Sequence, residues 1–236
     1  MAAHRNRWHI DSIQKGKWMT KISVIVPTYN RPAFLERALS SIDAQTFQDF
    51  EVIVVNDGGS PVSEVTKRHD KVMLIEHTKN KGLAAARNTG IKAATGEYIC
   101  FLDDDDVLYP NHFEVLINAM KDGAQVVYTD AHWWHNEQTY DKVLSEDFDR
   151  ERLRKHSLFP VMCVMARSEL FNGCMFDETL KSHEDWDLWN RLADKVDFVH
   201  IPEFTAAYSK RGGQDQISNH PYHIEAYRQV KKRYER

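Results

Sequence analysis

The chain has 236 residues, 42% of them hydrophobic and 28% charged, which suits one globular domain with a well-buried core. Its 31 Lys and Arg residues and 35 Asp and Glu residues leave a net charge of −4, so no overall basic field exists to attract nucleic acid. No apolar run approaches the roughly 20 residues that a membrane-spanning helix needs, and three cysteines without metal-ligand spacing indicate free thiols in a reducing, cytoplasmic setting.

The first 20 residues carry four basic residues but no apolar stretch of the kind found in secretory signals. They are either a natural extension or an expression remnant ahead of a start at Met19. The sequence leaves both readings open, and the folded domain is expected to begin at residue 21.

Between residues 21 and 102 short apolar strands alternate with helices. Strands are expected at 21–27, 51–56, 72–75 and 98–102, where β-branched and aromatic runs end at polar turns. Helices are expected at 32–44, 62–69 and 83–94, and Pro32 suits a first helical position. This alternation predicts an α/β fold with a Rossmann-like, mostly parallel sheet flanked by helices. The glycine patterns of dinucleotide-binding folds and of P-loop nucleotidases are both missing.

Beyond residue 110 the pattern is less regular. We expect a helix to about residue 121, strands at 125–128, 161–165 and 198–201, and a helix that starts at 182 with acidic residues in its first turn. Residues 131–158 have no clean period and are expected to form loops and short helices that determine acceptor specificity. Residues 223–236 predict a basic amphipathic helix.

Four consecutive carboxylates, Asp103 to Asp106, directly follow the buried strand at 98–102. Two unit charges ~4 Å apart repel by about 4 kcal/mol near a protein surface, so a cation among them would relieve the crowding. Ligands that are all oxygen favour Mg²⁺ or Mn²⁺. A solvated acidic turn is the ordinary alternative. The position at the carboxyl end of a strand, where open α/β sheets bind ligands, favours a metal site.

Four segments together resemble the motifs of the family 2 glycosyltransferases, enzymes of the GT-A fold: 23–30, 54–60, 82–90 and 98–106. A fifth segment, 184–189, resembles the acidic motif on the acceptor side of that family. The resemblance implies a single GT-A domain over 21–236, with a donor half at 21–130, an acceptor half at 131–222 and a C-terminal basic helix at 223–236. It also implies inverting transfer from a nucleoside-diphosphate sugar, with a UDP-sugar expected. The acceptor would be a saccharide or a lipid-linked molecule, in cell-surface polysaccharide or glycan synthesis.

The same resemblance implies residue roles. Asp185 would be the base that takes the proton from the acceptor hydroxyl. Asp105 and Asp103, the two ends of a D-x-D pattern, would hold Mn²⁺ or Mg²⁺. Asp57 would accept a hydrogen bond from the nucleobase, and Arg87 would lie near the diphosphate. The residues expected to bind substrate are Pro27, Thr28, Tyr29, Asn30, Asp57, Arg87, Asn88, Asp103, Asp104 and Glu184.

Each of these residues also has an ordinary structural interpretation. Asp57 could be a turn carboxylate, Arg87 a solvated helical arginine, and Asp185 a charge that complements a helix N-terminus. Trp186 and Trp189 could stack on a sugar, but core packing is the commoner fate of tryptophans at this spacing. The segment 208–218 resembles a mobile flap over the donor, although it lacks the metal-binding histidine that some family members place there.

Two other functions stay open at this point. A nucleotidyltransferase of related topology would carry a Gly-rich basic loop after its first strand, which residues 27–30 do not match. A non-catalytic module that binds sugar nucleotides would not need all five segments. The basic tail is most simply a solvated helix end, but its charges would also suit a peripheral contact with anionic lipid at the inner face of a membrane.

Overall fold

A computed structural model of the chain describes residues 20–135, 138–209 and 220–235. The expected N-terminal extension and most of the expected flap at 208–218 lie outside these ranges. The strands are β1 (Ile22–Thr28), β2 (Phe50–Asn56), β3 (Val72–Glu76), β4 (Tyr98–Phe101), β5 (Val107–Leu108), β6 (Val126–His135), β7 (Gln138–Leu144), β8 (Val164–Arg167) and β9 (Phe198–Ser209). The helices are α1 (Pro32–Asp43), α2 (Ser63–Thr66), α3 (Leu83–Ala93), α4 (His112–Met120), α5 (Arg150–Lys155), α6 (Glu184–Ala193) and α7 (Pro221–Tyr234).

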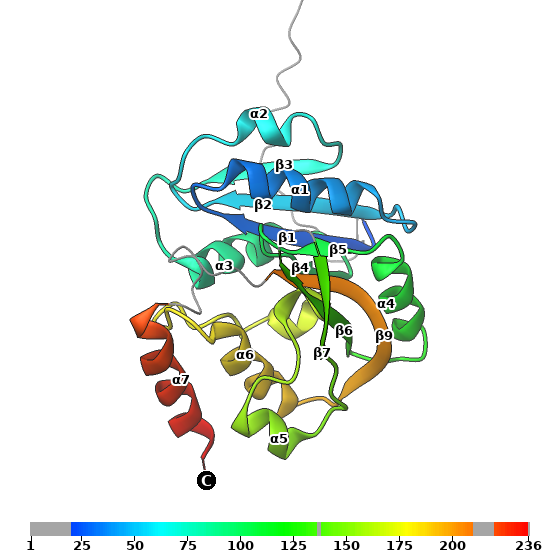
Figure 1. The fold of residues 1–236 in the computed structure, drawn as a ribbon, viewed down its shortest axis with the longest axis vertical. Helices are drawn as coiled ribbons and strands as arrows, with labels where there is room; N and C mark the ends of the chain where they lie inside the picture. Colours follow the sequence, from blue (N-terminus) through cyan, green and yellow to red (C-terminus); the bar gives the residue numbers. More distant parts are fainter. Residues whose placement is uncertain (1–19, 136–137, 210–219, 236) are drawn as a thin grey trace, which may run out of the picture.

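The strands form one curled sheet in the order β3-β2-β1-β4-β8-β6-β9-β5, and β7 pairs with β6 (Figure 1). β1 runs parallel to both β2 and β4, β2 runs parallel to β3, and β6 runs parallel to β9. β8 lies antiparallel between β4 and β6. The predicted α/β fold with a mostly parallel sheet is therefore confirmed.

Both faces of the sheet are covered, which explains why its strands read as almost continuous apolar runs. Successive side chains of β1 point to opposite faces: Val24 and Val26 pack in the core beneath α1 and α4, whereas Ile25 packs with α3 and α6. Trp186 and Trp189 of α6 are fully buried in that second core. Core packing, the commoner alternative, is thus the fate of both tryptophans.

The region 131–158 differs from expectation. Instead of loops and short helices alone, it contains the second half of β6, the antiparallel partner strand β7, and the single short helix α5. The pairing of β6 with β7 shifts register between His132 and Trp133. This irregularity interrupts the period-two pattern by which a strand is read from sequence.

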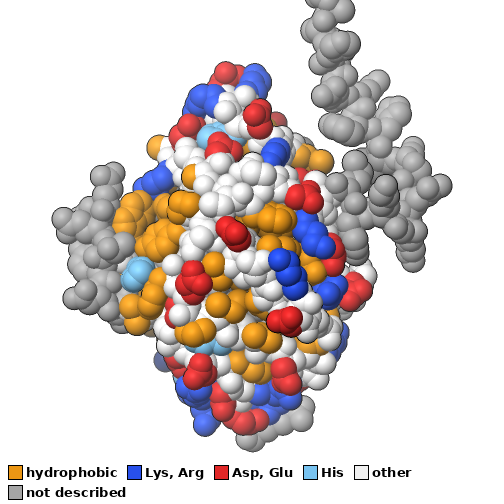
Figure 2. Space-filling model, turned by 90° about the vertical axis from the view of Figure 1, so that its right-hand side faces the viewer, with side chains coloured by type: hydrophobic (Ala, Val, Ile, Leu, Met, Phe, Trp, Pro, Cys, Tyr) orange, Lys and Arg blue, Asp and Glu red, His pale blue; other side chains and the backbone are white. Residues whose placement is uncertain are grey.

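On the one face that Figure 2 shows, charged side chains have no dominant sign. On the face shown in Figure 2, Lys and Arg side chains are intermixed with Asp and Glu side chains rather than gathered into one basic field. None of the described helices is long and apolar enough to cross a membrane.

Candidate active site

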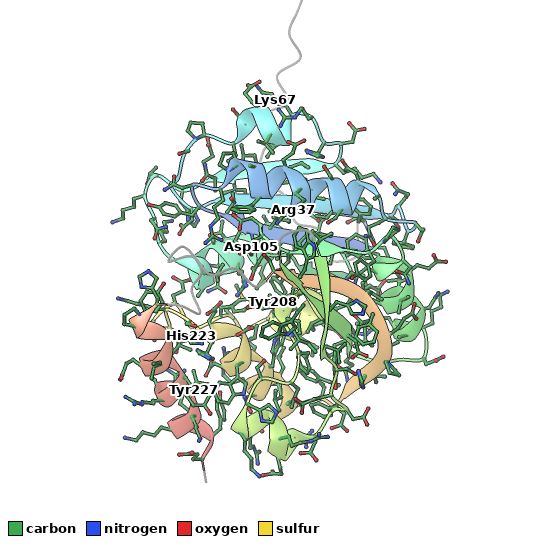
Figure 3. All side chains as sticks on the ribbon, in the orientation of Figure 1. Arg37, Lys67, Asp105, Tyr208, His223 and Tyr227 are labelled. Atoms are coloured by element: carbon green, nitrogen blue, oxygen red, sulfur yellow. The ribbon has the colours of Figure 1, made fainter. Side chains whose placement is uncertain are left out.

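The carboxyl ends of β1, β2 and β4 open into a cleft of about 1390 Å³. One wall, here called the sheet wall, consists of the turns after these three strands together with the start of α3. The opposite wall, here called the helix wall, consists of residues 178–185, which lead into α6, and of the first residues of α7. Figure 3 shows Asp105 and Tyr208 between helix α1, which carries Arg37, and helix α7, which carries His223.

The turn after β2 holds Asp57 in a fixed position. Gly58 adopts φ +72, and a Cβ there would lie 2.3 Å from the backbone of Lys79, so the turn packs directly on the 79–82 loop. This contact brings the backbone N–H groups of Lys81 and Gly82 to the Asp57 carboxylate, at 2.9 and 2.8 Å. Asp57 is buried but lines the cleft.

The turn after β1 contributes Pro27, Thr28, Tyr29 and Asn30 to the cleft lining. Asn30 adopts the left-handed conformation, with φ 59, and its Oδ1 accepts hydrogen bonds from the backbone N–H and hydroxyl of Ser60. Its side chain therefore ties the turn after β1 to the turn after β2. Tyr29 is exposed.

The acidic run alternates between two environments. All four aspartates belong to the cleft lining, but the side chains of Asp103 and Asp105 are 27% and 13% exposed, whereas Asp104 and Asp106 are buried. Asp104 accepts a hydrogen bond from the Thr28 hydroxyl at 2.7 Å. Asp106 accepts one from the backbone N–H of Ser209 at 2.8 Å, so it holds the end of β9 in place.

Burial perturbs the ionisation of the two buried carboxylates, Asp104 and Asp106. Burial, reinforced by the charge of Asp105, raises the pKa of Asp104 to about 7, although Arg31 opposes the shift. Burial and the neighbouring charges of Asp105 and Asp103 also raise the pKa of Asp106. A cation placed between the exposed pair would relieve this repulsion.

Arg87 of α3 joins the two walls. Its guanidinium donates to Asp103 of the sheet wall at 2.6 Å and to Glu184 of the helix wall. Burial would lower the pKa of Arg87, but the charges of Asp103 and Glu184 outweigh it and raise the pKa. Arg87 thus lines the cleft as expected, yet both of its terminal nitrogens are engaged by carboxylates.

Asn88, the next residue, does not belong to the cleft lining. Its side-chain amide donates to the Phe176 carbonyl at 3.0 Å and to Glu178 at 2.8 Å, and its oxygen accepts from the Phe176 N–H at 2.9 Å. These bonds fasten α3 to the segment before α6. Asn88 therefore has a structural role in this structure, and its expected contact with substrate stays a prediction.

Glu184 and Asp185 form the first turn of α6, directly after His183, which adopts the left-handed conformation with φ 58. Burial raises the pKa of Glu184 to about 7 despite the opposing charge of Arg87. Burial likewise raises the pKa of Asp185, again opposed by Arg87. Asp185 is partly exposed to the cleft and accepts from the Trp186 N–H at 2.7 Å. A carboxylate with a raised pKa is better matched to proton transfer near neutral pH.

Helix α7 supports the helix wall at both of its ends. Near its start, His223 lies 2.7 Å from the Ser182 hydroxyl, which also lies 3.1 Å from His183. Near its end, Arg233 and Tyr234 both donate to Asp187 of α6 at 2.9 Å. Arg233, one of the basic residues of the tail, is thus bonded to a carboxylate of the same chain. This reduces the basic surface of α7 that could contact anionic lipid.

Two arginines that we did not single out from the sequence lie at the acidic run. Arg31 Nη1 lies 3.2 Å from Asp104 and 3.4 Å from Asp105, and Arg37 donates to the Asp105 carbonyl at 2.9 Å. Arg31 directly follows segment 23–30, the first of the segments that resemble family motifs. This adjacency was the sequence signal that could have pointed to Arg31 as a site residue. His200, by contrast, bridges Asp130 and Asp147 at 2.7 and 2.8 Å and does not line the cleft.

The model of glycosyl transferase family 2 matches residues 23–172. The chain belongs to this family. An uncharacterized glycosyltransferase of Rickettsia conorii is 35% identical over 75% of this chain, but the match covers only 30% of that protein's length. The uncharacterized glycosyltransferase YwdF of Bacillus subtilis is 32% identical over 84% of this chain and 77% of its own length.

Solved structures agree with a family 2 fold. TarS 1–349 of S. aureus, in complex with UDP-GlcNAc, superposes with a TM-score of 0.75 at 23% identity and covers 89% of this chain and 64% of its own. A mannosyltransferase of Pyrobaculum calidifontis, in complex with GDP-Man and Mn²⁺, gives a TM-score of 0.67 at 19% identity and covers 93% of this chain and 68% of its own. At these identities the likeness shows the GT-A fold alone.

The residues of the acidic run fit the divalent cation that a family 2 fold implies. Asp103 and Asp105 offer hard oxygen ligands in the cleft lining, and each also contacts an arginine, Arg87 and Arg31 respectively. In the described part of the chain no three His, Cys, Asp or Glu side chains form a complete metal site. Mg²⁺ commonly uses one or two carboxylates and completes its coordination with substrate phosphates and water.

Proposed function

We propose that this chain is an inverting glycosyltransferase that moves a sugar from a nucleoside-diphosphate sugar, with UDP as the expected nucleotide, to a saccharide or lipid-linked acceptor. The observation that carries the proposal is one cleft with two sets of carboxylates on opposite walls. Asp57, Asp103 and Asp105 lie on the sheet wall, and Asp185 lies on the helix wall. Synthesis of a cell-surface polysaccharide or other glycan is the biological setting that we propose for this reaction.

Donor binding is assigned to the sheet wall. Asp57 would accept a ring N–H of the base, and the turn that contains Pro27, Thr28 and Tyr29 would line the nucleoside. Asp103 and Asp104 would lie at the ribose and metal side, and Asp105 and Asp103 would hold Mn²⁺ or Mg²⁺. When bound, the cation would neutralise charge that develops on the departing diphosphate. The proposal is supported by the complexes of the two structural neighbours, which hold UDP-GlcNAc in one case and GDP-Man with Mn²⁺ in the other.

Proton transfer is assigned to the helix wall. Asp185 would take the proton of the acceptor hydroxyl as its oxygen attacks the anomeric carbon from the side opposite the diphosphate. The new glycosidic bond forms while the bond to the β-phosphate oxygen breaks, and the nucleoside diphosphate leaves with the electron pair. Arg87 does not need to contact phosphate in this scheme. It holds Asp103 and Glu184 in place, and with them the two walls.

The proposal is tested by incubating the protein with a panel of UDP-, GDP-, CDP- and ADP-sugars in MnCl₂ and measuring the nucleotide released. We expect release of a nucleoside diphosphate from at least one donor, and loss of that release in EDTA. Exchange of pyrophosphate would instead indicate a nucleotidyltransferase. Binding of a sugar nucleotide without any turnover, with a range of saccharide and lipid-linked acceptors present, would indicate a non-catalytic module.

A further inference from the structure

His77 lies beside Asp57, and none of the roles assigned above explains it. The residue follows β3, and its side chain is 4% exposed. Its Nδ1 lies 2.6 Å from Asp57 Oδ1, and its Nε2 lies 2.9 Å from the hydroxyl of Thr89 on α3. One imidazole therefore links the turn after β2 to the middle of α3.

The surrounding hydrogen bonds assign the protons of this ring. The Thr89 hydroxyl donates its single proton to the Ala85 carbonyl at 3.0 Å, so its oxygen accepts from His77, and Nε2 carries a proton. Asp57 also accepts hydrogen bonds from the backbone N–H groups of Lys81 and Gly82. We assign Nδ1 as the donor in its 2.6 Å contact with Asp57 Oδ1.

These bonds occupy the two oxygens of Asp57 unequally. Oδ1 accepts from His77 and Lys81, whereas Oδ2 accepts from Gly82. Each carboxylate oxygen can accept about two hydrogen bonds, so within the described part of the chain Oδ2 retains one acceptor site. Since Asp57 lines the cleft, this site can receive a ring N–H but would repel a ring nitrogen that is itself an acceptor.

We propose that His77 is a positioning residue that fixes the plane of the Asp57 carboxylate. The cleft then selects nucleobases that carry a ring imino N–H, the class of uracil and guanine. It rejects cytosine and adenine, whose corresponding ring nitrogen is an acceptor. The inference rests on the proposed function, because it takes Asp57 to face the base of a nucleoside diphosphate.

Three substitutions separate a positioning role of His77 from simple filling of space. In His77→Asn the side-chain amide takes the place of Nδ1 and still donates to Asp57. In His77→Gln the amide reaches toward the place of Nε2 and Thr89, so Asp57 loses this donor. Thr89→Val, which is nearly isosteric, leaves the Asp57 contact but removes the second anchor of the ring.

Titration calorimetry with UDP and with CDP, each in MnCl₂, gives the readout. We expect wild-type protein to prefer UDP. We expect His77→Gln to weaken UDP binding by about 10- to 100-fold, the range for a lost hydrogen bond to a charged group, and to reduce the UDP-to-CDP preference by a similar factor. His77→Asn should restore most of that preference, and Thr89→Val should lower it less than His77→Gln does.

Several outcomes would overturn the inference. Equal loss of UDP and CDP affinity in both His77 variants would show a purely structural role, as would a wild-type preference that survives in His77→Gln. If His77→Gln does not fold, as judged by circular dichroism, an unchanged preference in Thr89→Val would overturn it. If the wild-type protein binds no nucleoside diphosphate, the proposed function fails together with this inference, whereas an unmoved preference for UDP defeats the inference alone.

Discussion

The sheet wall of the cleft consists of turns that follow parallel strands, whereas the helix wall consists of helix ends that pack on one another. On the sheet wall, Thr28 and Asn56 are register partners in adjacent strands, so the turns that follow them start side by side. On the helix wall, the first turn of α6 depends on side-chain bonds to α3 and α7 that span 97 and 46 residues of sequence. The register of the paired strands thus positions the sheet wall, whereas polar contacts between residues far apart in sequence position the helix wall.

Substitutions in the two walls should therefore affect different properties of the protein. A change on the sheet wall removes a contact to the donor while the sheet keeps its shape, so binding should suffer first. A change on the helix wall should affect turnover, or, where it breaks a bond between the walls, the stability of the whole domain. The predictions below use this contrast.

The sharpest test of the contrast is Asp185→Asn, which is nearly isosteric and removes the proposed proton acceptor. We expect kcat to fall by a factor of about 10² to 10⁴, the usual share of general-base catalysis, with little change in the affinity for UDP and Mn²⁺. Since burial raises the pKa of Asp185 and the base acts when deprotonated, wild-type kcat should rise with pH through that pKa. Steady-state kinetics and calorimetry measure both quantities.

The matched control is Asp194→Asn, the same chemical change at the opposite, exposed end of α6. It should leave kcat near the wild-type value. If Asp185→Asn turned over normally but lost UDP binding, the assignment of the two walls would be reversed.

Arg87→Met should break the link between the walls. It leaves Asp103 and Glu184 near each other without their shared cation, and removal of one partner from a buried ion pair typically costs about 3–5 kcal/mol. We expect a loss of this size in the free energy of unfolding, measured with urea. Arg150→Met, which removes an exposed pair with Asp197, should change stability by no more than about 0.5 kcal/mol. Equal effects of both variants would contradict the view that Arg87 couples the walls.

Sequence reasoning succeeded where structure is set locally. The parallel strands of the first 102 residues could be read because each is a short apolar run that ends at a polar turn. The two-residue strand β5 is too short to show a period, and the hairpin of β6 and β7 is disguised by its register shift.

In the site, too, local features could be predicted from the sequence, whereas contacts between distant elements could not. The D-x-D spacing did place Asp103 and Asp105 on one side of the chain, facing the cleft. The engagement of Arg87 by Glu184, 97 residues away, and of Arg31 by the acidic run depends on how distant elements approach one another. No periodicity in the sequence encodes such an approach, and the same holds for the bond between His77 and Asp57.

Low pH should reduce the stability of the fold through His112. This residue is fully buried on α4, and its Nδ1 lies 2.7 Å from the Thr205 hydroxyl of β9. Burial lowers the pKa of His112 from 6.5 to about 3. Between these two values the unfolded chain binds a proton that the folded protein does not. The free energy of unfolding should therefore fall by about 1.4 kcal/mol for each pH unit below 6.5 from this residue alone.

Urea unfolding of wild-type protein and His112→Asn between pH 7 and pH 4 checks this contribution. The variant should lose stability less steeply as the pH falls, even if it is less stable at pH 7. His156→Asn, at an exposed position, should keep the wild-type slope. Parallel slopes for wild type and His112→Asn would rule out His112 as the source of acid sensitivity.

Asp57→Ala should produce the smallest effect and the one most confined to the sheet wall. The variant loses the hydrogen bond proposed to reach the nucleobase, worth about 1–3 kcal/mol of binding free energy for a charged acceptor. Calorimetry with UDP in MnCl₂ should show this loss, and the KM for the donor should rise more than kcat falls. Asp49→Ala makes the same change at an exposed position just before the opposite end of β2 and should leave UDP affinity unaltered. A large fall in kcat without weaker UDP binding in Asp57→Ala would mean that the sheet wall also takes part in proton transfer, and the division of labour between the two walls would have to be abandoned.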